Sequence, residues 1–247
     1  MSSLTSDERI VLNNLQGGLP ITPRPFEKLS EELGLDEGTI LGTLRRLRKN
    51  NRLSRFGAVL NTRAMGGDSR LAAVSVPEDS RDQAASVIND YRTVTHNYVR
   101  DHDLNLWFVL SARSADRIDS TMGAIEDELG ETVFDLPKLT EYYVGLRFKF
   151  LEDGSVKTVS VDDDYGHVPE GESNGLSERQ RDLILELQDG LPLTKRPYRD
   201  LGGQVGFTEQ TTMNVLESLL EEGKIKRLGC VPNHYALGIR GNGMVVF

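Results

Sequence analysis

Cysteine is almost missing from this sequence, since Cys230 is the only one among 247 residues. A single thiol closes no internal disulfide and makes no paired-cysteine metal site, which excludes small disulfide-stapled domains and zinc ribbons. No apolar run reaches the roughly 18 residues that cross a bilayer, and the N-terminal MSSLTSDERI has neither the basic nor the apolar region of a signal peptide. We therefore expect a cytoplasmic protein without membrane association, with 38% hydrophobic residues to build a core.

Basic residues are too few to balance the acidic ones, and the net charge is -9. Residues 1–74 carry 11 basic and 8 acidic groups, residues 75–174 carry 9 and 21, and residues 175–247 carry 9 and 9. Only the first segment favours a polyanionic partner. Walker lysine and Gly-x-Ser-x-Gly motifs are also missing, which argues against nucleotide hydrolysis by a P-loop and against an α/β-hydrolase.

What is present is an internal repeat with a constant offset of 172 residues. Leu15-Gln16 and Gly18-Leu19-Pro20 return as Leu187-Gln188 and Gly190-Leu191-Pro192. Each copy predicts three short helices and a β-wing: in the first copy, a capped helix from residues 4–8, a second over 25–33, a third through Ile40 and Leu47, and a wing over 52–60. This pattern is typical of a winged helix-turn-helix, which we place at residues 1–66 and 176–240.

Between the copies the predicted elements follow the order βαββαβ of a ferredoxin-like domain, over residues 67–150. They are a strand at 70–76, a helix at 80–91, strands at 94–100 and 105–111, a helix at 115–129 and a strand at 140–148. Residues 151–175 are predicted to be an acidic linker. The fold class is therefore α+β. Residues 241–247 begin a second, truncated αβ domain, so either the chain is incomplete or another polypeptide supplies the rest.

The segment 94–110, VTHNYVRDHDLNLWFVL, carries the candidate site. His96, Tyr98, Arg100 and His102 occupy every second position, so on a β-strand they share one face. Residues 101–104 predict the turn of a hairpin whose second strand contains Trp107. Such a face can bind an anion and move protons.

The order of domains resembles the Lrp/AsnC architecture, and three segments resemble siroheme decarboxylases: RFGAVLN at 55–61, the hairpin at 94–110, and VPNHYALG at 231–238. In that family two such halves, often fused, remove CO2 from the two pyrrole acetates of siroheme. The product, 12,18-didecarboxysiroheme, serves heme d1 or an alternative route to heme. The resemblance covers residues 4–150 and 176–247, but this chain ends before the second half's hairpin.

The resemblance implies a carboxy-lyase that needs no cofactor, because siroheme brings its own iron and the reaction needs a proton rather than an electron or a hydride. Histidine suits the proton donor. His96 is the first candidate and His102 the second. Siroheme carries eight carboxylates and the chain is acidic, so local groups must hold the substrate. The predicted substrate-binding residues are Tyr98, Arg100, Asn105 and Trp107. We expect a homo- or hetero-oligomer formed through the αβ domain.

Two alternatives remain. The first is a DNA-binding regulator of the Lrp/AsnC type, supported by the basic residues Arg45, Arg46, Arg48, Lys49, Arg52 and Arg55. The matching stretch of the second copy contains Glu217, Glu221 and Glu222, so DNA binding is the weaker hypothesis. The second is a non-catalytic half that binds a tetrapyrrole only to complete a partner's site.

Overall fold

The computed structural model describes residues 4–137, 146–160 and 175–239, and has a mixed α+β fold. The predicted start of a second αβ domain at 241–247 lies outside these residues. The chain divides into two compact units. Unit 1 includes the described residues up to 60, with 146–160 and 176–239, and unit 2 includes residues 61–137. Within the described part, no helix is both long and apolar enough to span a membrane.

Unit 1 contains both copies of the helix-turn-helix, and equivalent residues start equivalent helices. The elements are α1 (Ser6–Leu15), α2 (Pro25–Leu33) and α3 (Glu37–Lys49) in the first copy, and α6 (Glu178–Leu187), α7 (Pro197–Gln204) and α8 (Glu209–Glu221) in the second. Thr5 and Ser177 each form a capping box with the residue three positions later. Proline at the first helical position starts both α2 and α7. The repeat therefore conserves the local signals that begin each helix.

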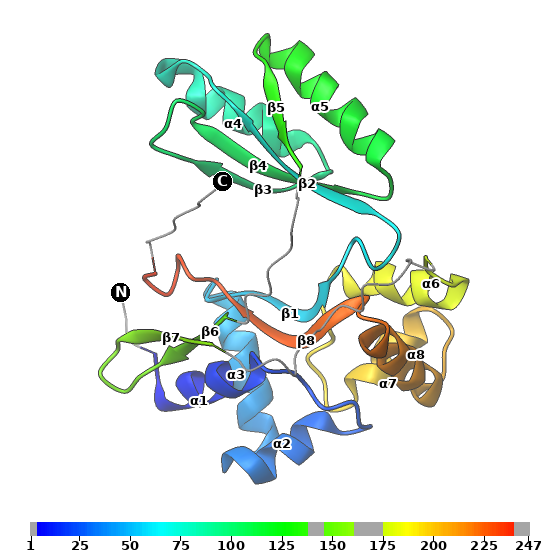
Figure 1. Ribbon diagram of the computed structural model, residues 1–247. Coiled ribbons are helices and arrows are strands. Elements are labelled where there is room, and N and C mark those ends of the chain that lie inside the picture. Colours follow the sequence, from blue (N-terminus) through cyan, green and yellow to red (C-terminus); the bar gives the residue numbers. More distant parts are fainter. Residues whose placement is uncertain (1–3, 138–145, 161–174, 240–247) are drawn as a thin grey trace. The chain divides into compact units, whose positions relative to one another are not determined.

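The two wings are not separate, because β1 (Leu53–Leu60) pairs antiparallel with β8 (Ile225–Pro232) in one two-stranded sheet (Figure 1). The register places Gly57 opposite Gly229. These two glycines are equivalent residues of the repeat, so the ladder is centred on an internal pseudo-twofold axis. The copies form one body through their wings.

Backbone approaches the sheet closely at this centre. A Cβ on Gly229 would lie 2.3 Å from the carbonyl oxygen of Leu15, and one on Gly57 would lie 3.0 Å from Cα of Gly190. Leu191 donates its backbone N–H to the carbonyl of Phe56 at 2.8 Å. Glycine is required here because the turn that ends the first helix of each copy packs against the wing strand of the other copy without space for a side chain.

A hairpin that the sequence did not predict completes unit 1. It consists of β6 (Leu146–Phe150) and β7 (Val156–Ser160). The side-chain amide of Asn13 both donates to and accepts from the backbone of Phe150, at 3.0 and 2.9 Å, and that of Gln16 does the same with Phe148, at 2.8 and 3.1 Å. Two amides of α1 thus pair with the free edge of β6 as a neighbouring strand would. The predicted linker is wrong for residues 151–160, and residues 161–174 lie outside the described part.

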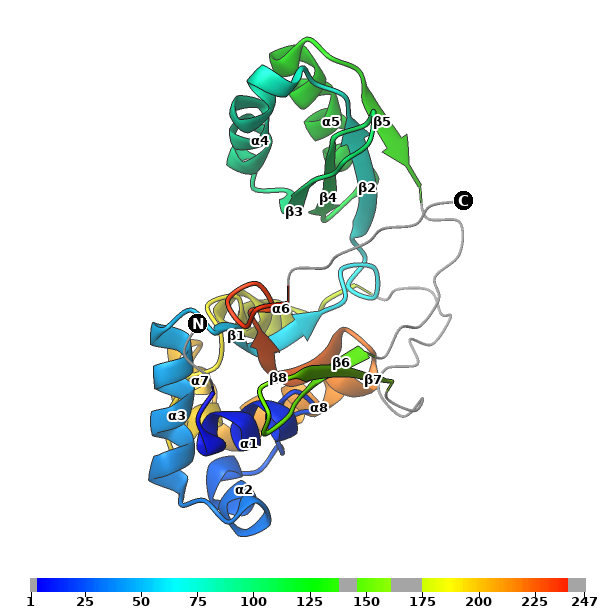
Figure 2. The same ribbon diagram turned by 90° about the vertical axis from the view of Figure 1, so that its left-hand side faces the viewer.

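Unit 2 is a ferredoxin-like sheet with two helices. Its elements are β2 (Asp68–Val74), the 3₁₀ turn η1 (Glu78–Ser80), α4 (Arg81–Asp90), β3 (Val94–Val99), β4 (Leu106–Ala112), α5 (Ala115–Leu129) and β5 (Val133–Leu136). The antiparallel sheet has the order β3-β4-β2-β5, and α4 and α5 cover one face (Figure 2). Of the strand predicted at 140–148, residues 146–148 belong to β6, which pairs with β7 in a separate sheet, and residues 140–145 lie outside the described part. The chain turns at Gly130, where φ is +69°, and the apolar residues directly after it already pair with β2.

The two faces of this sheet differ in what they carry. The helix-covered face forms the core, with the buried residues Val74, Leu106, Phe108, Leu110, Ile118 and Ile125. The opposite surface, which we call the open face, is the side of the sheet away from α4 and α5. On it the ladder aligns Tyr98, Trp107, Ala73 and Phe134 across the strands. Phe134 is 47% exposed at one end of that row.

We expect Gly229→Ala to destabilise unit 1 by about 1–3 kcal/mol, because the added methyl group meets a backbone oxygen that no rotamer change can move. Gly42→Ala is the matched control: it lies inside α3 with nothing within 4 Å of the new Cβ, so it should stabilise the protein by about 0.5–1 kcal/mol. Urea-induced unfolding measures both. Equal midpoints for the two variants would contradict the close approach at the wing sheet.

Candidate functional site

The β3–β4 hairpin of unit 2 places the predicted site residues at one edge of the sheet. β3 is the edge strand, and a bulge between Val94 and His96 sets which side chains face outward. Asn97 points to the helices, where its amide donates to the carbonyl of Ala85 at 3.2 Å. His96 and Tyr98 therefore lie on the open face, as the two-residue period predicts.

Three of the predicted residues form a contiguous stack. The rings of His96 and Tyr98 lie 6.0 Å apart between centroids with an interplanar angle of 15°, and Cζ of Arg100 lies 4.8 Å from the centroid of Tyr98. The guanidinium over the phenol is a cation–π contact. Among the described residues nothing hydrogen-bonds the exposed His96 ring, so both of its nitrogens face solvent or substrate. The stack therefore combines a cation, a phenol and an imidazole that can exchange a proton.

His102 lies in the turn rather than on the strand. The backbone N–H of Leu104 donates to its Nδ1 at 3.0 Å, and its ring meets Trp107 edge-on at a centroid distance of 6.2 Å. A neutral imidazole that accepts at Nδ1 carries its proton on Nε2. His102 is therefore fixed by the backbone as a donor through Nε2, in contrast to His96.

Trp107 lies beside Tyr98 on the neighbouring strand. Only 7% of its surface is exposed, and its indole N–H donates to the carbonyl of Leu104 at 2.6 Å. It pairs with Tyr98 across the ladder and contacts the His102 ring. The structure thus places Trp107 where it positions both rings, with little surface left to meet a ligand.

The side chain of Asn105 links the hairpin to the backbone of Val76, which follows β2. Its Oδ1 accepts from the N–H of Val76 at 3.1 Å and its Nδ2 donates to the carbonyl of Val76 at 2.8 Å. Its own carbonyl accepts from the N–H of Arg100 at 2.9 Å, which extends the hairpin ladder past the end of β3. The side chain predicted to bind substrate is therefore engaged in holding the β2–η1 connection against the hairpin.

A hollow of about 400 Å³ opens at this end of unit 2. We call it the hairpin-end hollow, and its lining residues are Glu78, Arg81, Val99, Arg100, Asp101, His102 and Asn105. Sequence reasoning missed Glu78 and Arg81. The signal that could have found them is the βαββαβ order, because β2 ends opposite the start of β4, next to the hairpin turn. The residues that follow β2 therefore meet the turn.

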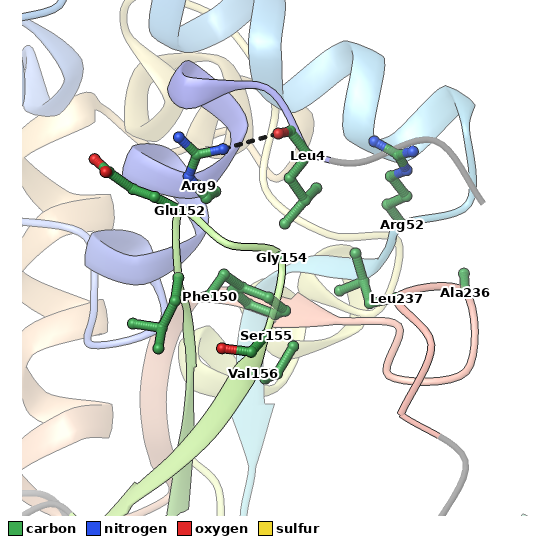
Figure 3. Close-up of a pocket in the computed structure, with 11 residues that line it drawn as sticks. Leu4, Arg9, Arg52, Phe150, Glu152, Gly154, Ser155, Val156, Ala236 and Leu237 are labelled. Atoms are coloured by element: carbon green, nitrogen blue, oxygen red, sulfur yellow. Dashed lines mark hydrogen bonds between the residues drawn. The ribbon is translucent and has the colours of Figure 1, made fainter.

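Unit 1 has a smaller cavity of about 260 Å³ between α1, the β6–β7 turn and the segment after β8 (Figure 3). Two arginines lie at it, but each has an internal acceptor. Arg9 donates to the carbonyl of Leu4 at 3.0 Å, and Arg52 donates to the buried carboxylate of Glu8 at 2.9 Å. Both guanidinium groups donate to acceptors within unit 1, so this cavity is a weaker candidate site than the hollow in unit 2.

Three of the basic residues proposed to bind DNA also have acceptors within unit 1. Arg46 donates to the carboxylate of Glu8 at 3.2 Å, as Arg52 does. Arg45 donates to the carbonyl of Leu193, in the second copy, at 2.5 Å. At the start of α3, where base contacts usually begin, Glu37 lies 3.2 Å from Lys195 of the second copy. The N-terminal end of α3, which a DNA-binding helix-turn-helix would place against the bases, therefore carries an acidic residue and contacts the second copy.

Comparison with known proteins adds a family to this geometry. The model of the siroheme decarboxylase NirDL-like HTH domain matches residues 8–53 and 180–225, and that of the AsnC-like ligand binding domain matches 64–143. The siroheme decarboxylase NirG subunit of Paracoccus pantotrophus is 43% identical over 145 residues, which are 59% of this chain and 92% of the relative. The NirDL subunit of Paracoccus denitrificans is 31% identical over 237 residues, 96% of this chain and 70% of the relative.

Solved structures agree on the fold. The crystal structure of the siroheme decarboxylase NirDL aligns with a TM-score of 0.66 at 23% identity, covering 92% of this chain and 65% of that chain. A second crystal structure of NirDL, in complex with an iron-uroporphyrin III analogue, aligns equally well at 22% identity. This chain thus spans about two thirds of the NirDL chains, as the alignments cover 65% and 66% of them.

We expect Asn105→Ala to loosen the hairpin rather than remove a ligand contact. Two backbone groups of Val76 lose their partner, which costs roughly 1–3 kcal/mol per unsatisfied buried group. Amide hydrogen exchange at Val76 should accelerate, and the unfolding midpoint should fall. Asp103→Ala, an exposed change in the same turn, is the control and should alter neither. Unchanged exchange at Val76 in Asn105→Ala would show that the hydrogen bonds of Asn105 do not hold the hairpin to Val76.

Proposed function

This chain belongs to the siroheme decarboxylase family, and from that premise we propose that it removes CO2 from the two pyrrole acetates of siroheme. The product is 12,18-didecarboxysiroheme, an intermediate for heme d1 or for an alternative route to heme. The observation that carries the proposal is the cluster of His96, Tyr98, Arg100 and His102 on one hairpin. These are the groups that a decarboxylation of a polycarboxylate needs: a proton donor and local cations.

The chemistry assigns different tasks to the two histidines. When the bond to the carboxylate carbon breaks, its electron pair stays on the methylene carbon attached to the pyrrole, and a proton must reach that carbon. We assign this proton to His96, whose ring is exposed and not committed to the described backbone. His102, which accepts from Leu104, is suited to donate a hydrogen bond from Nε2 to a substrate carboxylate.

Tyr98 and Arg100 hold and orient the substrate in this proposal. A guanidinium grips a carboxylate with two parallel hydrogen bonds, and a phenol donates one more. Local cations matter because the chain's net charge of -9 repels an anionic substrate at long range. The stacking of Arg100 on Tyr98 keeps the guanidinium beside the phenol, so that both groups can bind the same substrate.

We further propose that no redox or hydride cofactor takes part, and that iron enters only as part of siroheme. Loss of CO2 with protonation leaves the oxidation state of the ring unchanged, so the reaction needs no electron acceptor. We also propose a cytoplasmic location. Its support is that Cys230, the single cysteine, has no partner in the chain for a disulfide, as suits a reducing compartment.

Oligomeric assembly fits the relatives, which are described as NirD, NirG and NirDL subunits. We propose that the αβ domain of unit 2 meets a second such domain, in a copy of this chain or in a different subunit. Its open face supports this, because Phe134 is exposed there in an aromatic row with Trp107 and Tyr98. The regulator hypothesis has less support, since Arg45, Arg46 and Arg52 have acceptors within unit 1.

Anaerobic incubation of the protein, with its partner subunits, and siroheme tests the proposal. Mass spectrometry should show stepwise loss of two carboxyl groups. The reaction should proceed without added nicotinamide, flavin or metal salt. Siroheme that stays unchanged with the complete assembly present would refute the decarboxylase.

His96→Ala should lower the turnover rate by about 10²- to 10⁴-fold, which is the usual contribution of a positioned general acid. Siroheme affinity should remain close to that of the unchanged protein, because a proton donor acts mainly in the transition state. Thr95→Ala, the adjacent exposed position, is the control and should keep most of the activity. A lost affinity with an unchanged turnover rate would move His96 from proton transfer to substrate binding.

A further inference from the structure

Arg81 lines the hairpin-end hollow together with Arg100 and His102, yet none of the roles assigned above uses it. It is the first residue of α4, so its backbone is held by a regular helix rather than by a loop. Its side chain lines the hollow together with residues of the hairpin turn. Two arginines from separate elements thus approach one space of about 400 Å³.

The guanidinium of Arg81 has an unused donor. Its Nε is buried and has no hydrogen-bond partner among the described residues. Its one ion pair in that part of the chain is with Glu78 at 3.6 Å, and Glu78 is 88% exposed while Arg81 is 31% exposed. An exposed pair at that separation contributes little, whereas a buried N–H without an acceptor is costly. Arg81 is thus held by no close ion pair within the described part, and the exposed part of its side chain is available to an anion in the hollow.

The residues that line the hollow also restrict the kind of anion that it can bind. Glu78 and Asp101 are exposed carboxylates that balance the two arginines, so the hollow does not attract polyanions by net charge. Its selectivity must come from geometry, and a planar carboxylate matches the paired N–H groups of a guanidinium. Val99, which is 48% exposed, offers an apolar contact for the carbon chain behind the carboxylate.

We propose, resting on the proposed function, that Arg81 is a substrate-binding residue that holds a carboxylate side chain of the tetrapyrrole jointly with Arg100. That carboxylate is one that does not react. A guanidinium stabilises a carboxylate more than the neutral CO2 that it becomes, so two arginines on a reacting acetate would raise the barrier. Arg81 therefore anchors the macrocycle so that a different side chain reaches His96.

The test compares Arg81→Gln with Arg81→Lys and with Arg92→Gln, an exposed arginine of unit 2 outside the hollow. Absorbance titrations with siroheme and with didecarboxysiroheme give the dissociation constants, and anaerobic turnover gives kcat. Arg81→Gln should weaken binding of both tetrapyrroles by the same factor, about 10- to 100-fold, the usual range for a charged hydrogen bond. The value of kcat at saturation should stay within about twofold. Arg81→Lys should restore part of the affinity, and Arg92→Gln should change nothing.

Each of the other possible results contradicts a specific part of the proposal. Equal affinities in Arg81→Gln and Arg92→Gln, with a turning-over enzyme, overturn the subsite and leave the decarboxylase intact. Weaker binding of siroheme alone means that Arg81 holds a reacting acetate, against the assignment made here. An affinity loss that Arg81→Lys does not restore indicates a structural role and also overturns it. Arg81-dependent binding of both tetrapyrroles without any turnover overturns the decarboxylase and supports the subsite.

Discussion

The antiparallel pairing of β1 with β8 is the contact on which unit 1 depends. A wing strand on its own has an exposed edge, and here each wing covers the edge of the other. The pairing requires backbone to approach backbone at Gly57, Gly190 and Gly229, so glycine at these positions is a packing requirement. Once the wings are joined, the two helix-turn-helix copies stand as one body with a shared sheet.

That union also decides what the basic residues of the first copy do. Arg45 reaches a carbonyl of the second copy, while Arg46 and Arg52 neutralise Glu8, which is 2% exposed. A buried carboxylate is tolerated only when it is paired, so these cations are committed to the fold. These arginines of the first helix-turn-helix therefore stabilise unit 1, and the candidate site lies in unit 2. This division agrees with a family whose members are described as decarboxylase subunits.

In unit 2 the decisive feature is a hairpin at a sheet edge, held in place by Asn105 and Trp107. Asn105 ties the hairpin to Val76, and Trp107 is paired with Tyr98 across the ladder and contacts the His102 ring. The side chains of Asn105 and Trp107 form their hydrogen bonds within unit 2. The neighbouring side chains of the hairpin are therefore held in position without a ligand. Preorganisation of this kind is what separates a site from a polar surface, and it also explains why two residues expected to touch substrate serve as supports.

The sequence by itself determined the local structure and the kinds of chemical group. The repeat predicted both helix-turn-helix copies, proline marked the start of α2 and α7, and the helix at 115–129 has its predicted bounds. The alternation at His96 and Tyr98 placed both on one face, because side-chain direction follows from position along a strand. Only the tertiary structure decided that β5 takes the place beside β2 in the sheet, that β1 pairs with β8, and that Arg81 and Arg100 line one hollow. Those choices depend on contacts between residues far apart in the chain, which short-range periodicity does not encode.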